Sequence, residues 1–231
     1  MCRHKILFPI TKSLFILAVL LSSTLDCFSQ DKDAAFWPGI KLSHPFYDKL
    51  KETVFIQERI ENNISKHDNI FFDFCTSYQI FKNLDAEAAY VYVNHVNSDN
   101  SHSNQHQLYF DFVWKQKLSK RFKFKYTPQF QMQWTDIYTS PNGKISENFL
   151  RNKFALEYRL KKRIQPFVFI EFRSNVTRQP FYFNRTRYSA GTTFHLHKKI
   201  DIDVYYMLQR GYNEGSPDDL YIIGINFCKE I

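Results

Sequence analysis

One stretch of the chain, residues 121–136, alternates apolar and polar side chains almost without interruption. Successive side chains of a β-strand point to opposite faces, so the pattern predicts a strand with one apolar and one polar face. Its length reaches the roughly 9–11 residues that a tilted strand needs to cross a bilayer. Pro128 removes a ladder hydrogen bond, and we expect a bulge there. The apolar parity is Phe122, Phe124, Tyr126, Pro128, Phe130, Met132 and Trp134, and the polar parity is Lys123, Lys125, Thr127, Gln129, Gln131 and Gln133.

Similar segments repeat along most of the chain. They predict about ten strands, with a further candidate at Trp37–His44. Besides residues 121–136, the predicted strands cover residues 53–64, 69–80, 84–96, 108–115, 150–160, 164–176, 183–196, 200–209 and 220–227.

The connections between these segments are of two kinds that alternate along the chain. Short, basic connections lie at residues 81–83, 119–121, 161–163 and 197–199, and longer, polar ones at 97–107, 137–146, 175–182 and 210–217. Outer-membrane barrels have short periplasmic turns and longer external loops. The pattern therefore predicts an all-β, antiparallel, up-and-down transmembrane β-barrel. Ten strands, with both termini in the periplasm, are the first choice and twelve the second, because adding Trp37–His44 gives an odd number.

The first 29 residues have the composition of a signal peptide that is removed on export. Arg3, Lys5 and Lys12 precede and border the apolar run at residues 14–21, and small residues follow before Gln30. The run is too short for a membrane-spanning helix, which needs about 20 residues. We therefore divide the chain into a signal peptide (1–29), an N-terminal extension or extra strand (30–52) and a barrel (53–231). Cys75 and Cys228 remain after cleavage, and we expect two unpaired thiols.

A soluble β-sandwich or a lipocalin-like barrel would also alternate, with its apolar face turned inward. Strand length, the export signal and an aromatic content of 18% with six glycines favour the membrane barrel. Trp114 and Trp134, near predicted strand ends, occur where interfacial aromatic girdles form. The net charge of +8 is scattered among aromatic and acidic residues, so no nucleic-acid partner is expected.

The parity expected to face the lumen carries many charged side chains. In a narrow barrel they would pair across the interior as a charge network, or line a selective pore for small anions. The predicted network comprises Arg59, Asp73, Asp111, Arg151, Glu157, Arg159, Glu171, Arg173, Arg185, Arg187, Asp201 and Asp203.

Residues that could carry catalysis or bind a metal are few. His102, Ser103 and Asn104 lie in a predicted polar loop, without fixed geometry for a nucleophile and its base. Ser189 and His195 share one parity of a strand but are too far apart to touch. His102 with His106, and His195 with His197, lack a third metal ligand. We therefore expect no enzyme, no metal and no cofactor.

Several segments resemble the domain-of-unknown-function family 2490, an uncharacterised family of outer-membrane barrels found largely in Bacteroidetes. The resemblance spans most of the mature chain and implies location and fold without an activity. The segments are Trp37 with Gly39, Gln57–Arg59, Asn148–Arg151, Leu156–Leu160, Phe169–Phe172, Asn184–Arg185, Tyr188–Gly191 and Val204–Gln209.

The expected protein is thus a small barrel of the cell outer membrane with a structural or narrow-pore transport role. Its expected partners are outer-membrane lipid and, during biogenesis, the barrel-assembly machinery; a small-molecule ligand is left unspecified. Two alternatives stay open. One is an outer-membrane enzyme acting on envelope lipids, and the other is a soluble periplasmic β-barrel that binds an apolar ligand.

Overall fold

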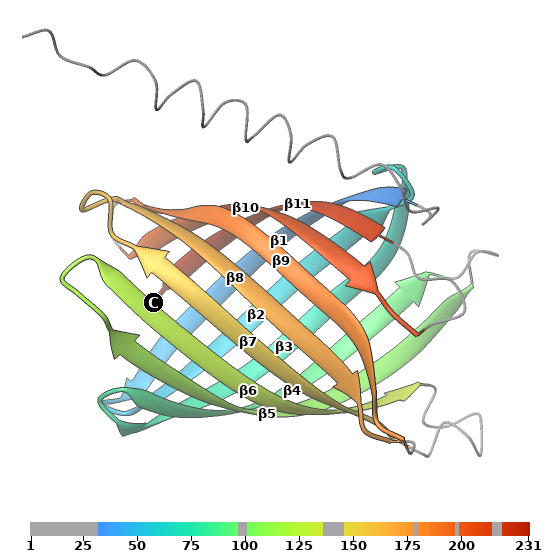
Figure 1. The fold of residues 1–231 in the computed structure, drawn as a ribbon, viewed down its shortest axis with the longest axis horizontal. Helices are drawn as coiled ribbons and strands as arrows, with labels where there is room; N and C mark the ends of the chain where they lie inside the picture. Colours follow the sequence, from blue (N-terminus) through green and yellow to red (C-terminus); the bar gives the residue numbers. More distant parts are fainter. Residues whose placement is uncertain (1–31, 97–100, 136–145, 178–179, 197–198, 214–218) are drawn as a thin grey trace, which may run out of the picture. The chain divides into compact units, whose positions relative to one another are not determined.

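Eleven strands make up the ordered fold in the computed structural model, which describes residues 32–96, 101–135, 146–177, 180–196, 199–213 and 219–231. The strands are drawn in chain order from blue to red in Figure 1. Their bounds are β1 Lys32–Tyr47, β2 Leu50–Glu61, β3 Lys66–Phe81, β4 Leu84–Val96, β5 His102–Lys117, β6 Phe122–Thr135, β7 Glu147–Tyr158, β8 Ile164–Asn175, β9 Tyr182–His195, β10 Ile200–Gly211 and β11 Asp219–Glu230.

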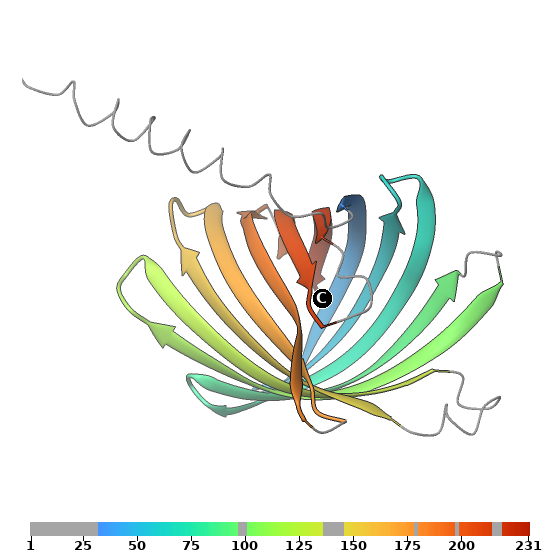
Figure 2. The same ribbon diagram turned by 45° about the vertical axis from the view of Figure 1, so that its right-hand side comes forward.

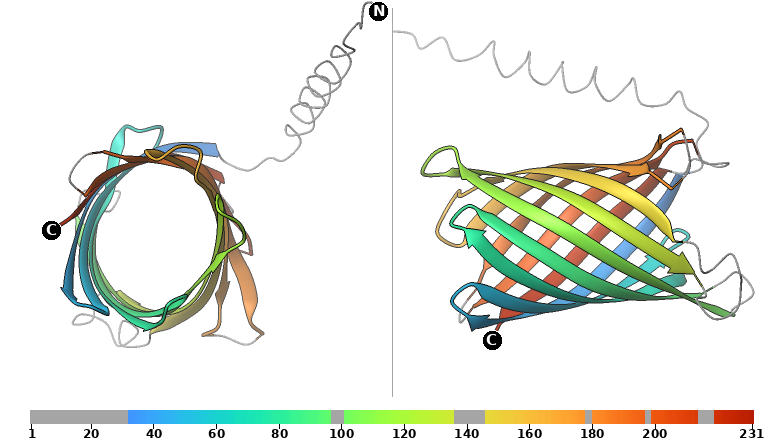
Figure 3. Two further views of the ribbon diagram at one scale, coloured as in Figure 1. Left: turned by 90° about the vertical axis from the view of Figure 1, so that its left-hand side faces the viewer. Right: turned by 90° about the horizontal axis from the view of Figure 1, so that it is seen from below.

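The strands close into one barrel in which each strand pairs with its neighbours in sequence. Viewed end on, the ribbon forms a complete ring (Figure 3). Every sequential pair is antiparallel, whereas β1 and β11 pair in parallel to close the ring, with Lys32 opposite Asp219 and Ser43 opposite Glu230. The predicted all-β barrel is therefore confirmed.

The strand number is eleven rather than the predicted ten or twelve, and the difference lies in β1. The even numbers rested on the assumption that all pairs, including the closing one, are antiparallel. A parallel closing pair admits an odd number, so the candidate at Trp37–His44 joins the barrel as β1. The expectation of both termini at the same end was wrong: β1 begins beside the start of β11, and the chain ends at the opposite end of the barrel.

The two ends of the barrel differ in their connections, as Figure 2 shows. We call the end whose connections are shorter on average the turn end; these are residues 48–49, 82–83, 118–121, 159–163 and 196–199. The loop end carries the connections 62–65, 97–101, 136–146, 176–181 and 212–218. Ile231 lies at the turn end, where its backbone N–H donates to the carbonyl of Ser43 at 2.8 Å.

On most strands the polar parity faces the lumen and the apolar parity faces outward; on β1, β4 and β11 apolar residues such as Trp37, Val91 and Ile222 also face inward. On β6, Phe130 is 37% exposed whereas its neighbour Gln131 is 4% exposed. Trp114 and Trp134 belong to the outward parity and lie toward opposite ends of the barrel, since Trp114 pairs with Leu84 beside the turn at 82–83 and Trp134 pairs with His106. This orientation is the reverse of a lipocalin, which turns its apolar face inward.

Pro128 interrupts a ladder without forming the predicted bulge. On the β5 side the pairs Asp111–Gln129 and Trp114–Tyr126 keep one register, while the positions between them are unpaired. On the β7 side the register runs through Pro128 without a break. The missing N–H therefore costs ladder contacts on one side only, and no extra residue is needed.

The apolar core lies inside the barrel, against the seam between β1 and β11. Ala35, Trp37, Met207, Leu220 and Ile222 form a buried cluster there, with Phe169 and Tyr205 packed against it. Gly224 makes room for this packing, because a Cβ atom at its position would collide with the ring of Tyr205.

The start of β1 is fastened to the turn between β2 and β3. Asn62, Asn63 and Ile64 all have positive φ. The carboxylate of Asp33 accepts hydrogen bonds from the backbone N–H groups of Asn62 (2.8 Å) and Asn63 (2.6 Å). The N–H of Ile64 donates to the carbonyl of Ala34. These bonds satisfy turn amides that no ladder reaches.

Cys75 and Cys228 are both free thiols. Within the described residues, no helix has the length and apolar character to cross a membrane.

Candidate functional site

The centre of the lumen contains an ion triad on three neighbouring strands. Arg151 on β7 donates to both carboxylate oxygens of Glu171 on β8, at 2.8 and 2.9 Å, and Arg187 on β9 donates to the same carboxylate at 3.3 Å. Glu171 lies directly opposite Arg187 on β9. On β7 it lies opposite Lys153, two residues along the strand from Arg151. Diagonal neighbours on one face of a sheet are within reach of long side chains, which explains why all three meet.

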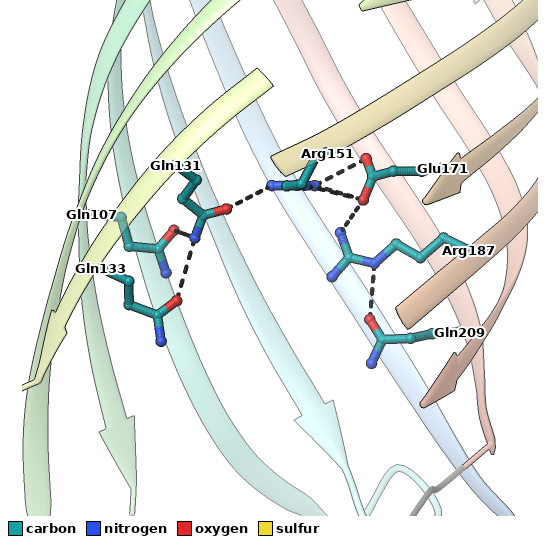
Figure 4. Close-up of polar contacts among 7 residues, drawn as sticks. All are labelled: Gln107, Gln131, Gln133, Arg151, Glu171, Arg187 and Gln209. Carbon is teal, nitrogen blue, oxygen red and sulfur yellow. Dashed lines mark hydrogen bonds and ion pairs between the residues drawn. The ribbon is translucent and has the colours of Figure 1, made fainter. Parts of the chain in front are cut away.

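Amide side chains extend this triad around the wall on both sides (Figure 4). Gln131 accepts a hydrogen bond from Arg151 at 3.2 Å, and Gln209 accepts one from Arg187 at 2.9 Å. Gln131 donates in turn to Gln107 at 3.0 Å and to Gln133 at 3.3 Å. The network therefore runs from β5 to β10 along the inside of the barrel.

Aromatic rings hold further cations against the lumenal wall. The guanidinium of Arg59 lies between the rings of Trp37 and Phe71, 3.9 and 3.7 Å from their centroids. The guanidinium of Arg187 also lies over Trp37, at 5.9 Å. Cation–π stacking fixes the orientation of a guanidinium and replaces part of its lost hydration.

Two more cations follow the same arrangement on β7 and β8. Arg173 stacks on Phe149 at 3.6 Å, and the ammonium of Lys153 lies 4.1 Å from the centroid of Phe169. Stacked cations thus surround the triad.

A cavity of about 640 Å³ occupies the lumen between these groups and the loop end. We call it the vestibule. Its lining contains five arginines and two carboxylates, so its formal charge is positive. The charged residues of the lining are Arg59, Asp73, Glu147, Arg151, Arg173, Arg185 and Arg187.

Asp73, on β3, is held by a neutral donor. The hydroxyl of Tyr109 on β5 lies 2.9 and 3.1 Å from the two carboxylate oxygens of Asp73 on β3. Asp111, two residues along β5 from Tyr109, is 7% exposed. Both acids lie on strands other than the three that carry the triad.

The predicted charges nearest the turn end form local pairs. The carboxylate of Glu157 binds the ammonium groups of Lys125 and, at 3.6 Å, Lys123. Asp201 contacts His195 Nδ1 at 2.9 Å, and Thr193 donates to Asp203 at 2.6 Å. These pairs are separate from the central triad.

The twelve predicted charged residues are therefore only partly brought together. Arg151, Glu171 and Arg187 form the triad, and Arg59, Asp73, Arg173 and Arg185 share the vestibule with Arg151 and Arg187. Arg159 lies beyond the end of β7 and is exposed. Its N–H donates to the carbonyl of Arg121 in the neighbouring turn-end connection.

Sequence reasoning missed one lysine and the amide and aromatic members of the site. Lys153, Gln131 and Gln209 share the lumenal parity, and parity alone would have included them. Tyr205 shares the parity of Asp201 and Asp203, whereas Trp37 lay in the further candidate strand at residues 37–44. The lumenal position of Trp37 follows from the pairing of β1 with β11, which the sequence did not predict.

The histidines and serine considered for catalysis have structural neighbours. His102 and His106 lie on β5 rather than in the predicted loop; their Nδ1 atoms contact Asn94 at 2.9 Å and the hydroxyl of Tyr90 at 2.6 Å. Ser189 donates to the carbonyl of Tyr206 at 3.0 Å. His197 lies outside the described residues, and among those described no cluster of three metal-ligating side chains occurs.

Comparison with known proteins gives one sequence family. The family described as "protein of unknown function (DUF2490)" matches residues 34–220. No curated protein matches the chain.

Two solved structures are similar to the barrel. The β domain of the Bordetella autotransporter Brka is 9% identical, with a TM-score of 0.47 over 76% of this chain and 81% of that one. A structure titled "bacterial polysaccharide outer membrane secretin" is 11% identical, with a TM-score of 0.44 over 76% of this chain and 73% of that one.

Proposed function

Because this chain belongs to the DUF2490 family, whose function is unknown, its role must be inferred from its own lumen, and we propose that it is an outer-membrane barrel that conducts small anionic solutes through a narrow, arginine-lined interior. The family match confirms the resemblance seen in the sequence. The observation that carries the proposal is the vestibule, whose lining holds five arginines and two carboxylates.

The outer surface supports a membrane location. Large apolar side chains of the outward parity are exposed on strand after strand, such as Ile56, Phe74, Phe110 and Val168. In water such a continuous apolar surface would be strongly unfavourable, whereas in lipid it is the expected exterior of a closed barrel. Every strand of the closed ring is paired on both sides, so no backbone edge with unpaired hydrogen-bonding groups faces lipid.

The lumenal charge supports selection for anions. The triad contributes two guanidinium groups and one carboxylate, and Arg59, which stacks on the same Trp37 ring as Arg187, adds a third guanidinium. Like charges that are close together in a partly desolvated space repel one another and attract a counter-ion. A small anion entering from the loop end would relieve this excess.

The middle of the barrel supports a narrow rather than an open path. The vestibule and a second cavity at the turn end share no lining residue. Along the barrel axis, between the two cavities, Phe169 and Tyr205 pack against the core cluster at the β1–β11 seam. The ammonium group of Lys153 lies over the ring of Phe169. Barrels of this strand number leave little open lumen, which agrees with a restricted path.

A planar-bilayer measurement tests the proposal. The folded barrel should show heat-modifiable gel migration, small ion currents and, under a salt gradient, a reversal potential of the sign for anion preference. Arg59→Gln should reduce that preference, whereas Lys32→Gln, which removes a charge from an exposed position at the start of β1, should leave it unchanged. Cation preference, or no current through the folded barrel, would contradict a conducting role.

The proposal assigns no reaction to this chain. The polar lumen is also unsuited to the apolar ligand that a lipocalin-like protein would bind. Unchanged lipid A and phospholipids in a deletion strain would agree with a non-enzymatic barrel, and altered acylation would contradict it.

A further inference from the structure

The two ends of the barrel carry opposite charge. The five turn-end connections contain ten basic residues and one acidic residue, whereas the five loop-end connections contain two basic and four acidic residues. Each turn-end connection has at least one lysine or arginine, so the positive charge forms a ring. The conducting lumen described above does not require this ring, because the vestibule lies toward the loop end.

A second cavity, of about 610 Å³, lies within this basic ring. It is lined by the connection between β5 and β6 with the strand ends on either side of it, by Glu157 and Arg159, and by the start of β8. Lys123 and Glu157 have the lumenal parity whereas Phe122 faces outward, so the cavity reaches from the mouth of the barrel to its outer rim. Five of its lining residues are basic, and its acidic residue, Glu157, is already paired with Lys123 and Lys125. The basic lining residues are Lys117, Lys120, Arg121, Lys123 and Arg159.

Local hydrogen bonds fix the connection that presents these cations. The hydroxyl of Ser119 accepts from the backbone N–H groups of Arg121 at 3.2 Å and Phe122 at 3.1 Å. The N–H of Leu118 donates to the carbonyl of Phe122 at 3.0 Å. The turn is thus held in a defined shape, with Lys120 and Arg121 exposed on it.

Apolar side chains adjoin the cations on the outer surface. Phe122, which lines the cavity, is 41% exposed, and Leu118 is 60% exposed. The ring of Phe122 packs on Tyr158 at 4.7 Å between centroids, and Arg121 Nη1 donates to the Tyr158 hydroxyl at 3.3 Å. A cationic group above a lipid-facing aromatic surface is complementary to a lipid whose headgroup is anionic and whose chains lie below it.

We propose that the outer rim of the turn-end cavity, beside Phe122, is a binding site for the phosphate-bearing headgroup of an anionic phospholipid. Lys120, Arg121 and Arg159 would bind the headgroup, and Leu118 and Phe122 would contact its acyl chains. The basic ring would then select anionic lipid at this end of the barrel. The inference rests on the membrane location proposed above and is independent of ion conduction.

Quenching of tryptophan fluorescence by brominated lipids tests the site. In a Trp134→Phe background, Trp114 remains as an outward-facing tryptophan near the turn end, while Trp37 is 3% exposed inside the barrel. The barrel is reconstituted in phosphatidylcholine vesicles that contain a small fraction of dibrominated phosphatidylglycerol or dibrominated phosphatidylcholine. We expect phosphatidylglycerol to be preferred by about fivefold or more, the effect of one or more basic groups engaged at a membrane surface.

Matched variants locate the effect. Lys120→Gln/Arg121→Gln/Arg159→Gln should abolish the preference, and Lys32→Gln/Lys66→Gln, at the loop end, should retain it. Equal quenching by the two lipids in the parent protein, or a preference that survives the triple variant, would overturn the inference. Failure of the parent protein to fold into vesicles would instead contradict the membrane location, so heat-modifiable migration is recorded on the same samples.

Discussion

Glu171 occupies the position on which the charge balance of the lumen depends. It is 7% exposed and lies between two arginines, which share its carboxylate. Placing an acid between two bases on adjacent strands joins β7, β8 and β9 on the lumenal face. A buried pair stabilises a fold weakly compared with an apolar substitute, but removal of one partner is costly because the other charges stay buried.

Glu171→Gln should therefore destabilise the barrel. The substitution keeps the size of the side chain but leaves Arg151 and Arg187 without their shared carboxylate, and we expect a loss of about 3–5 kcal/mol in the free energy of unfolding. Urea unfolding of the lipid-reconstituted protein, followed by tryptophan fluorescence, measures it. Glu147→Gln, at an exposed position on β7, is the control and should have a much smaller effect. Equal losses for both variants would contradict the role given to Glu171.

Gly224 leaves the space that the ring of Tyr205 occupies. Tyr205 on β10 lies over Gly224 on β11 and receives a hydrogen bond from Gln57 on β2 at 3.5 Å. The tyrosine therefore crosses the inside of the parallel seam. Space at Gly224 is what allows this crossing.

Gly224→Ala should displace the Tyr205 ring and destabilise the seam by about 1–3 kcal/mol, the usual cost of an overpacked core. In a Tyr205→Ala background, where the ring is absent, the same substitution should cost much less. A double-mutant cycle from chemical denaturation gives this coupling. Additive effects of the two substitutions would show that the ring and the glycine do not interact.

At the scale of the strand, the alternation of β6 decides which surface faces lipid. The strand is long, and with a rise of about 3.4 Å per residue and a tilt near 45° its outward aromatic positions from Phe122 to Trp134 span roughly 30 Å. This span matches the hydrocarbon thickness of a bilayer, so the strand length and the face assignment agree.

Cysteine substitutions at two adjacent positions of β6 test the face assignment. In a background without Cys75 and Cys228, Phe124→Cys should react with a lipid-soluble reagent and Lys125→Cys with a small water-soluble one. The two residues differ by one position along the strand, so depth is matched and orientation differs. Mass spectrometry of labelled, reconstituted protein reports the yields. The reverse pattern would indicate an apolar interior.

The strands were predictable from sequence to the extent that their outward side chains were apolar along their full length. The range 84–96 coincides with β4, and 121–136 exceeds β6 by one residue at each end. β5 was predicted too short because its first outward residues, His102, Asn104 and His106, are polar. They share a loop's composition, and only the ladder to β4 shows that they continue the strand.

The central site was predictable by parity and no further. Parity placed Arg151, Glu171 and Arg187 on one face, but which acid meets which base depends on the register of adjacent strands. Register is set by turn geometry and by bulges, such as the shift between Arg173 and Ser174 on β8, that composition does not reveal. Arg159 has the lumenal parity as well, but β7 ends one residue before it, so no ladder fixes its position.

For the whole barrel, the parallel closing pair determines at which end β1 begins and at which end β11 ends. An odd number of strands that are otherwise antiparallel must place the two ends of the barrel domain at opposite ends. A ten-strand barrel would place them together. The strand number and the side of each terminus are therefore one question, and a single experiment can decide both.

Labelling of the termini from one side of the membrane is that experiment. In a background without Cys75 and Cys228, Lys32→Cys should react with an impermeant maleimide from the same side as Ser65→Cys in the β2–β3 turn. Ile231→Cys should react from the opposite side, together with Lys82→Cys in the β3–β4 turn. The two turn variants serve as references for the loop end and the turn end, so the result does not depend on which end faces the cell exterior. Reaction of Lys32→Cys and Ile231→Cys from the same side would contradict the parallel pairing of β1 with β11 and restore an even-stranded barrel.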